Sequence, residues 1–337
     1  MNNRERVLGT LNFEKVDRLP LIEWAAWWDK TTDRWKEEGL EESLDTREII
    51  EHFGLDFLRQ FWLIHNGNGL PKDLEHGAGP IADEADYDKY RFALYPEDSI
   101  KWSESEIRKV KQAHENGDFA VWITLNGYFW NPRILFGIEN HLFSFYDNPE
   151  LYHRMCNDLC EFHLKIIDEF CEILVPDFMS FAEDMSYNNG PMLSEEMFNE
   201  FIKPYYVKVI AKLKSYGIKV FVDTDGDVMP MIPWLLDAGV EGILPLERQA
   251  GVDVAEIRKK YPKLLMLGGY DKMVMKQGEA AMRAEFERLL PVMRSGGYLP
   301  SVDHQTPPDV SLENYEIYAK LFKEYSYKAA DKGEGTT

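Results

Sequence analysis

The sequence predicts an α/β protein, a (β/α)8 barrel with an N-terminal helical extension. Short apolar runs alternate with helical patterns at least five times from residue 178 onward, and such alternation is typical of a parallel sheet. The strand candidates number about eight, and 337 residues suffice for a barrel of this class. After the first strand candidate, the chain lacks the glycine-rich phosphate loop of a doubly wound dinucleotide-binding sheet.

The N-terminal half contains the less regular elements. An amphipathic helix is predicted at Asn3–Leu11, and further helices at residues 47–53 and 103–116. Strand candidates span residues 19–24, 57–64 and 119–125. Residues 71–96 are polar without a clear period, so we expect them to form an excursion from the repeating scaffold.

The C-terminal half alternates regularly. Asn148 and Pro149 form an N-cap and a first-turn proline, and they open a long helix with one apolar face. Strands are predicted at residues 178–182, 220–222, 242–246, 264–267 and 298–302. Helices are predicted from Ser194, with a kink at Pro204, and at residues 229–238, 254–260, 280–293 and 312–322. One barrel domain is expected over residues 1–328, followed by a disordered tail at residues 329–337.

Composition excludes several classes of protein. With 59 acidic and 38 basic residues the net charge is −21, so nucleic acid and anionic membranes are not expected partners. No run of 18 apolar residues and no signal-peptide core is present. The cysteines are Cys156, Cys160 and Cys171, in one helical pattern and without a CxxC motif. This usage favours the reducing cytoplasm over a disulfide framework or a cysteine zinc site.

Polar side chains follow most of the predicted strands. Barrel enzymes place their active sites at the C-terminal ends of the strands, so these side chains should meet at one mouth. They are Glu23, His65, Asn126, Glu183, Asp184, Asp223, Glu247, Asp271, Asp303 and His304. Trp24, Trp27 and Trp28 follow the first strand candidate and are expected to form either core packing or the wall of a substrate pocket.

The stretch K-V-F-V-D-T-D-G-D at residues 219–227 concentrates the acidic groups. Crowded carboxylates require either protonation or a bound cation. Carboxylates with one imidazole match a divalent metal site, with zinc as the usual ion. The predicted metal ligands are Asp223, Asp225, Glu247 and His304. Alternatively, Asp225 and Asp227 form a solvated Asx turn, Asp223 caps the next helix, His304 is an ordinary loop histidine, and Asp271 braces the G-G-Y-D turn.

Several motifs resemble the uroporphyrinogen decarboxylase superfamily. They are N-R-E-R-V-L-G-T-L-N-F-E-K-V-D-R-L-P at the start, G-P-M-L-S-E-E-M-F-N-E-F-I-K-P-Y-Y, the D-G-D turn, G-V-E-G-I-L-P-L-E, L-G-G-Y-D-K and G-G-Y-L-P-S-V-D-H. The resemblance extends over nearly the whole chain, and it implies a (β/α)8 barrel with its site at the strand C-termini.

The resemblance is closer to the cobalamin-dependent methyltransferases than to true decarboxylases. Decarboxylases of the family carry an arginine-rich M-R-Q-A-G-R segment after the first strand, whereas this chain has E-W-A-A-W-W-D-K. The zinc-binding H-x-C-G of the methyltransferases corresponds to Asp223-Thr224-Asp225-Gly226, and their final cysteine falls near His304. An oxygen-rich zinc would be the stronger Lewis acid.

The resemblance thus implies a zinc enzyme that transfers a methyl group from a small O-methyl or N-methyl donor to a corrinoid (cobalamin) carried by a partner protein. Glu183 or Asp184 would orient substrate or handle a proton. Substrate-binding positions would be Glu23, Trp24, Trp28, His65, Asn126 and Asp271. Two alternatives stay open: a metal-free decarboxylase or lyase that uses Asp223 as charge stabiliser on a small carboxylic acid or tetrapyrrole-like substrate, and a non-catalytic binding barrel.

Overall fold

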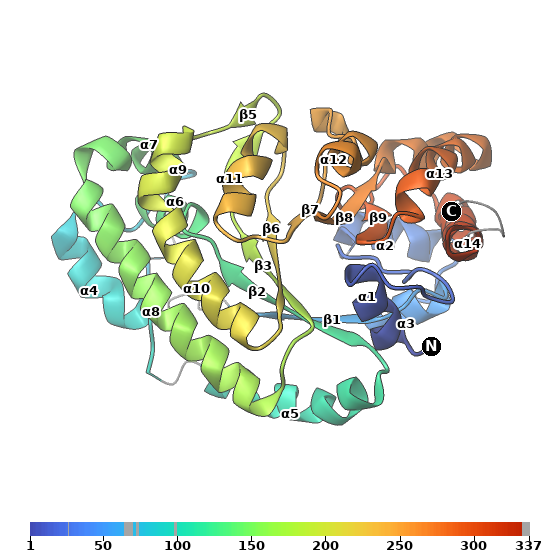
Figure 1. Cartoon of the computed structure of the whole chain (residues 1–337), viewed down its shortest axis with the longest axis horizontal. Coiled ribbons are helices and arrows are strands. Elements are labelled where there is room, and N and C mark those ends of the chain that lie inside the picture. The colour runs from blue at the N-terminus through green and yellow to red at the C-terminus, as the bar shows by residue number, and fades with distance from the viewer. Residues whose placement is uncertain (26, 64–69, 72–73, 98–99, 332–337) are drawn as a thin grey trace.

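The computed structural model describes residues 1–25, 27–63, 70–71, 74–97 and 100–331. Within them, seven parallel strands form one curled sheet in the order β1-β2-β3-β6-β7-β8-β9 (Figure 1). These strands are β1 (Leu58–Trp62), β2 (Ala120–Asn126), β3 (Phe178–Ala182), β6 (Lys219–Asp223), β7 (Gly242–Leu244), β8 (Leu265–Tyr270) and β9 (Tyr298–Val302). A short antiparallel hairpin, β4 (Ser186–Tyr187) with β5 (Gly190–Pro191), follows β3.

The sheet curls around an apolar core of its own. All seven residues of β2 are buried, as expected for a parallel strand that is covered on both faces. One cluster of buried apolar side chains contains inward-facing residues of most strands. Ile22 and two residues of the first helix, Val7 and Leu11, also belong to it. The strand residues in this cluster are Ala120, Trp122, Phe178, Phe221, Leu244, Leu265, Leu267 and Leu299.

The strand predicted at residues 19–24 is wrong, because these residues have no strand conformation. Pro20 lacks a backbone N–H, and the N–H of Leu21 donates to the carboxylate of Asp56 at 2.9 Å instead of to a neighbouring strand. The segment still lies between the two edges of the sheet, since Trp24 donates to Ser301 and Val302 of β9. The described residues therefore show a seven-stranded curled parallel sheet and not the eight strands of the predicted barrel.

Helices form the outer layer around the sheet. α8 and α10 pack against each other on one side, and α13 packs against α14 on the other (Figure 1). In chain order the α-helices are α1 (Asn3–Leu11), α2 (Asp29–Glu37), α3 (Thr46–His52), α4 (Glu84–Leu94), α5 (Lys101–Asn116), α6 (Trp130–Phe136), α7 (Ile138–Asp147), α8 (Pro149–Ile173), α9 (Glu195–Phe201), α10 (Lys203–Ser215), α11 (Ile232–Asp237), α12 (Val254–Lys260), α13 (Glu279–Met293) and α14 (Leu312–Ala330). The 3-10 helices are η1 (Met229–Met231), η2 (Arg248–Ala250) and η3 (Lys272–Gln277).

Several helices differ from the sequence-based expectation. The excursion at residues 71–96 contains α4, whose N-cap Asp83 accepts from the N–H of Asp86. α2, α6 and α7 were not predicted, and each begins without a side-chain cap. Pro204 separates α9 from α10 instead of bending one helix. Residues 329 and 330 continue α14, whereas residues 332–337 of the predicted tail lie outside the described part.

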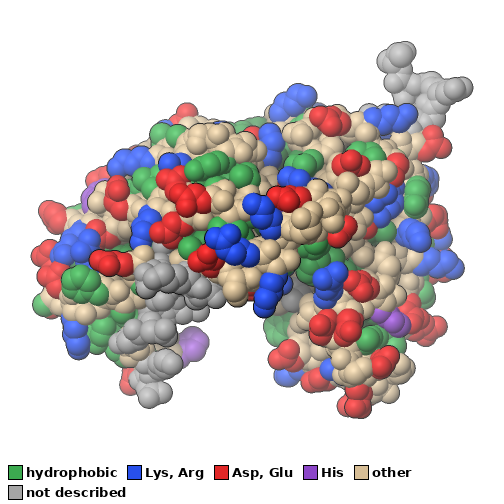
Figure 2. Space-filling view, turned by 90° about the horizontal axis from the view of Figure 1, so that it is seen from below, with side chains coloured by type: hydrophobic (Ala, Val, Ile, Leu, Met, Phe, Trp, Pro, Cys, Tyr) green, Lys and Arg blue, Asp and Glu red, His purple; other side chains and the backbone are tan. Residues whose placement is uncertain are grey.

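The surface mixes both signs of charge despite the net charge of −21. In the view from below, lysine and arginine side chains alternate with aspartate and glutamate over the same elements (Figure 2). None of the helices in the described ranges is long and apolar enough to cross a membrane.

Candidate metal centre

A tight turn fixes the acidic stretch that follows β6. Gly226 has φ +80°, and a Cβ there would lie 2.4 Å from the backbone of Tyr187, so only glycine fits. The N–H of Thr224 donates to the carbonyl oxygen of Leu244 at 3.0 Å. Ser186 Oγ donates to the carbonyl oxygen of Asp225 at 2.5 Å. The turn is therefore held from β7 on one side and from the β4–β5 hairpin on the other.

Three of the predicted metal ligands converge at the carboxyl ends of three strands. Asp225, Glu247 and His304 follow β6, β7 and β9, and each offers a ligand atom within 4.8 Å of the others. His304 Nε2 lies 3.8 Å from Asp225 Oδ2. All three side chains are partly exposed. Two carboxylates and one imidazole at this spacing fit a zinc ion that keeps an open coordination position.

Backbone contacts aim these side chains at one another. Glu247 Oε2 accepts from the N–H of Gly226 at 2.9 Å, which ties the second carboxylate to the Asp225 turn. Leu246, just before Glu247, has φ +66°, and Asp184 at the end of β3 has φ +43°. Left-handed backbone at residues other than glycine costs about 1–3 kcal/mol and tends to cluster at functional sites.

The predicted ligand Asp223 lies beside this trio rather than within it. Burial raises its pKa well above the usual value, and the carboxylates of Asp184, Asp225 and Glu247 add to the effect. Burial, with Asp184 and Glu247, also raises the pKa of Asp225 to about 7. The pKa of Asp184 is raised by burial as well. This group of carboxyls thus needs protons or a cation to relieve its repulsion.

The imidazole of His304 is kept neutral and oriented. Burial lowers the pKa of His304, and Lys272 lowers it further, which suits a metal ligand because only neutral imidazole coordinates. The ring of Trp24 lies edge-on to it, with centroids 6.2 Å apart. His304 follows directly on Asp303, whose buried carboxylate accepts from the N–H of Arg248 at 3.0 Å and from Lys272 Nζ at 3.3 Å.

Lys272 and Arg248 were not singled out from the sequence, although both stand one residue after a strand-end acid. The backbone N–H of Lys272 also donates to Asp303, at 3.2 Å. These contacts link the loops after β7, β8 and β9, and thereby fix the segment that carries His304. Only the spatial arrangement identifies Asp303 as their common acceptor.

Glu183 and Asp184, the predicted catalytic pair, lie in different environments. Glu183 is 1% exposed, and its carboxylate accepts from the N–H groups of Tyr128, Phe129 and Trp130 and from the hydroxyl of Tyr206. Burial raises its pKa to about 7. Asp184 is partly exposed and is electrostatically coupled to His304 and Glu247. Glu183 therefore anchors the chain that follows β2, whereas Asp184 lies next to the trio.

Glu23 and the predicted aromatic wall lie beside β9. Glu23 accepts from Ser301 Oγ at 3.1 Å and from the hydroxyl of Tyr315 at 2.9 Å, and burial raises its pKa to about 8. Trp27 is buried in the core, whereas Trp28 is 48% exposed. Trp27 and Trp28 border a cavity of about 420 Å³ that Gln305, the neighbour of His304, also lines. The core-packing expectation is confirmed for Trp27, whereas a substrate pocket at Trp28 stays a prediction.

The remaining predicted substrate positions are scattered. Asn126 is buried at the end of β2 and donates to Asn131 at 3.2 Å. Asp271 caps η3 by accepting from the N–H of Met273 at 2.9 Å, and it also accepts from Gln249, which matches the turn-bracing alternative. Asp227 likewise accepts from the N–H of Met229. His65 lies outside the described residues.

Comparison with solved structures supports the fold. A methyltransferase from Methanosarcina mazei superposes with a TM-score of 0.68 at 15% identity, and the match covers 96% of this chain and 99% of that one. A putative vitamin-B12-independent methionine synthase from Listeria monocytogenes matches at 13% identity over 96% and 99% of the two chains, with a TM-score of 0.44. The similarity to the Methanosarcina protein, at 15% identity, concerns the fold alone.

Comparison with known sequences identifies the family. No curated protein matches the chain. Residues 78–325 match the family model described as uroporphyrinogen decarboxylase (URO-D). This match includes the ends of β2, β3, β6, β7, β8 and β9, and with them the trio Asp225, Glu247 and His304. The chain belongs to the uroporphyrinogen decarboxylase family.

Proposed function

We propose that this chain is a zinc-dependent methyltransferase that moves a methyl group from a small O-methyl or N-methyl donor to a corrinoid carried by a partner protein. The observation that carries the proposal is the convergence of Asp225, Glu247 and His304 at the strand ends. The fold shared with the Methanosarcina methyltransferase is consistent with it. Zinc bound by these residues would act as a Lewis acid on the donor's oxygen or nitrogen.

The chain's own residues account for the rest of the chemistry. A reduced corrinoid, when bound, would supply the electron pair for the new bond to the methyl carbon. The donor's oxygen or nitrogen would keep the pair of the broken bond and would need a proton. Burial raises the pKa of Asp184, which suits this carboxyl to hold that proton beside the trio. Asp303 and Lys272 keep His304 in place, and Trp24 shields one side of its ring.

Decarboxylation of uroporphyrinogen fits this mouth poorly. Burial, together with the neighbouring carboxylates of Asp184 and Glu247, raises the pKa values of both Asp223 and Asp225. A substrate with several carboxylates would add to that repulsion. Residues 23–30, where decarboxylases carry arginines, contain none.

The metal assignment is tested by analysis of the purified protein. We expect about one zinc per chain in the wild type and a loss of most of it in Asp225→Ala and His304→Ala. Asp227→Asn is the matched control, because Asp227 lies two residues from Asp225 but accepts from the N–H of Met229 at 3.0 Å, and we expect it to keep its zinc. Equal zinc in all four proteins, or none in the wild type, would contradict the assignment.

The reaction is tested separately with methyl donors and reduced free cobalamin. Methyl transfer converts the Co(I) absorption spectrum into that of methylcobalamin, and we expect this change only with zinc-loaded protein. Activity on a carboxylic acid that survives a strong chelator, without methyl transfer, would favour the metal-free lyase. Absence of catalytic activity, together with ligand binding that is unchanged in the Asp223→Ala/His304→Ala double variant, would favour the non-catalytic binding barrel.

A further inference from the structure

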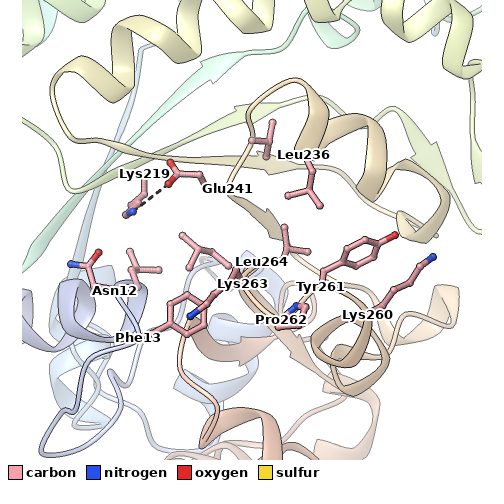
Figure 3. Close-up of a pocket in the computed structure, with 13 residues that line it drawn as sticks. Asn12, Phe13, Lys219, Leu236, Glu241, Lys260, Tyr261, Pro262, Lys263 and Leu264 are labelled. Carbon is pink, nitrogen blue, oxygen red and sulfur yellow. Dashed lines mark hydrogen bonds and ion pairs between the residues drawn. The ribbon is translucent and has the colours of Figure 1, made fainter.

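A cavity of about 610 Å³ opens at the end of the sheet opposite the candidate metal centre (Figure 3). It is lined by Lys219 and Leu265, the first residues of β6 and β8, and by Glu241, which precedes β7. The end of α1 contributes Phe13 and its neighbours. Its volume is within the range of small-molecule sites. The lining shares no residue with the centre formed by Asp225, Glu247 and His304.

An apolar wall forms the body of the cavity. Phe13, Leu236, Tyr261 and Leu264 contribute to it, and Leu236 is 38% exposed although it is a large apolar side chain. The close-up shows these side chains around one opening, with Lys263 next to Phe13 (Figure 3). An apolar surface of this kind favours a ligand with a hydrocarbon body.

The backbone at Phe13 is strained where it supports this wall. Phe13 has φ +61°, a conformation that costs about 1–3 kcal/mol for a residue with a side chain. Its ring is held against Gly297, where a Cβ would come within 2.2 Å of it. Gly297 in turn donates its N–H to the carbonyl oxygen of Thr10 at 2.8 Å. The ring is therefore a rigid part of the cavity rather than a mobile surface group.

The rim of the cavity is cationic in a protein of net charge −21. Lys219, Lys260 and Lys263 line it against a single acid, Glu241. Glu241 is paired with Lys219 at 3.2 Å. Lys260 and Lys263 lie over the rings of Tyr261 and Phe13 at 5.2 and 4.7 Å, and no ion pair to either is found in the described part of the chain. Two ammonium groups next to an apolar wall are thus available to an anion.

We propose that this cavity is a second binding site, for a small organic anion with an apolar body, such as a medium-chain or aromatic carboxylate. The carboxylate binds at the lysine rim, where Lys263 lies over Phe13 and Lys260 lies over Tyr261. The hydrocarbon part covers the apolar wall of Phe13, Leu236 and Leu264. Charge complementarity selects the anion, because the lining carries three cations and one anion. The site is independent of the proposed methyl transfer.

The test uses 8-anilinonaphthalene-1-sulfonate, an aromatic anion whose fluorescence rises on binding, with octanoate as competitor. In the full-length protein we expect saturable binding that octanoate displaces. Lys260→Glu/Lys263→Glu should weaken both ligands about tenfold. The control Lys320→Glu/Lys323→Glu makes the same charge change at exposed positions of α14 and should change neither affinity.

Two further measurements keep the proposal falsifiable if the double variant folds poorly. Leu236→Glu places a carboxylate on the wall at an already exposed position and should also weaken octanoate. Octanamide, the uncharged analogue, should compete about fivefold more weakly than octanoate. Unchanged octanoate binding in the variants, or equal competition by the amide, overturns the proposal. A wild-type dimer that Leu236→Glu dissociates in sedimentation would assign the cavity to a second copy of the chain and would also overturn it.

Discussion

Glu183 and Asp184 are neighbours in sequence, yet the hydrogen bonds around them differ. The carboxylate of Glu183 accepts three backbone N–H groups and the hydroxyl of Tyr206, and Gly127 has no room for a Cβ because that carboxylate lies 1.9 Å from its position. These bonds hold the chain after β2 against the end of β3. Asp184 is more open and faces the metal-ligand trio.

This difference predicts that substitutions at the two positions separate stability from activity. Glu183→Ala leaves the buried donors without an acceptor and should lower the free energy of unfolding by about 3 kcal/mol. Asp184→Asn should leave it nearly unchanged but reduce methyl transfer about a hundredfold. Urea denaturation and the cobalamin assay measure both quantities. A Glu183→Ala protein as stable as the wild type would contradict the anchoring role of Glu183. A fully active Asp184→Asn protein would contradict the catalytic role of Asp184.

At the scale of elements, side chains add to the backbone bonds that attach the segment at residues 19–24, such as the 2.8 Å bond from the N–H of Asp56 to the carbonyl oxygen of Leu21. Arg18 donates to both oxygens of Asp56, at 2.6 and 2.7 Å, and Asp56 also accepts from Leu21. Asp56 is buried at the approach to β1. One carboxylate therefore connects the segment that lies along β9 to the opposite edge strand.

Removal of that carboxylate should loosen the connection between the sheet edges. Asp56→Ala leaves Arg18 without its buried partner and should cost about 3–5 kcal/mol. Amide hydrogen exchange should accelerate at residues 19–24 before it does in β3. Asp17→Ala is the control, because Asp17 pairs with Arg6 at an exposed position, and it should cost less than about 1 kcal/mol. Equal losses in the two variants would show that Asp56 has no special role.

The elements also show what sequence patterns can predict. The strands at Phe178–Ala182 and Tyr298–Val302 have the predicted bounds, because a short apolar run between polar residues defines a buried parallel strand. β8 continues through Gly268 and Gly269, where glycine suggested a turn. A Cβ at Gly268 would lie 2.1 Å from the carbonyl oxygen of Pro245, so glycine there permits close approach of the neighbouring chain.

The candidate centre was predictable to a similar degree. Asp225, Glu247 and His304 could be grouped in advance because the carboxyl ends of parallel strands meet at one edge. The anchoring of Glu183 depends on N–H groups more than fifty residues away, and the contact of Lys272 with Asp303 spans two loops. Such pairings follow from three-dimensional packing and leave no local signal in the sequence.

At the scale of the whole molecule, the sheet separates two sites of opposite character. Its carboxyl end gathers acids around one histidine, and its amino end carries the lysine-rimmed cavity. The core cluster of Phe178, Phe221, Leu244 and their neighbours lies in the interior of the sheet. Because this core consists of apolar side chains, we expect the protein to stay folded when a metal is removed.

Buried acids should make the metal-free protein less stable as pH rises. The folded-state pKa values of Glu23 and Glu183 are raised from 4.5 to about 8 and about 7, so between these limits the folded state binds more protons than the unfolded state. Their stabilising contribution is therefore complete below about pH 4.5 and is lost as pH rises through about 7 to 8, roughly 8 kcal/mol in total.

Thermal unfolding in a chelator, followed from pH 5 to pH 8.5, measures this loss. Glu23→Gln removes one of these titrating groups while keeping a similar shape, so its melting temperature should match that of the wild type near pH 5 and exceed it at pH 8.5. Glu14→Gln, at an exposed position on the same N-terminal segment, should follow the wild type. A wild-type melting temperature that rises over this interval would show that Glu23 and Glu183 are ionised in the folded protein at neutral pH.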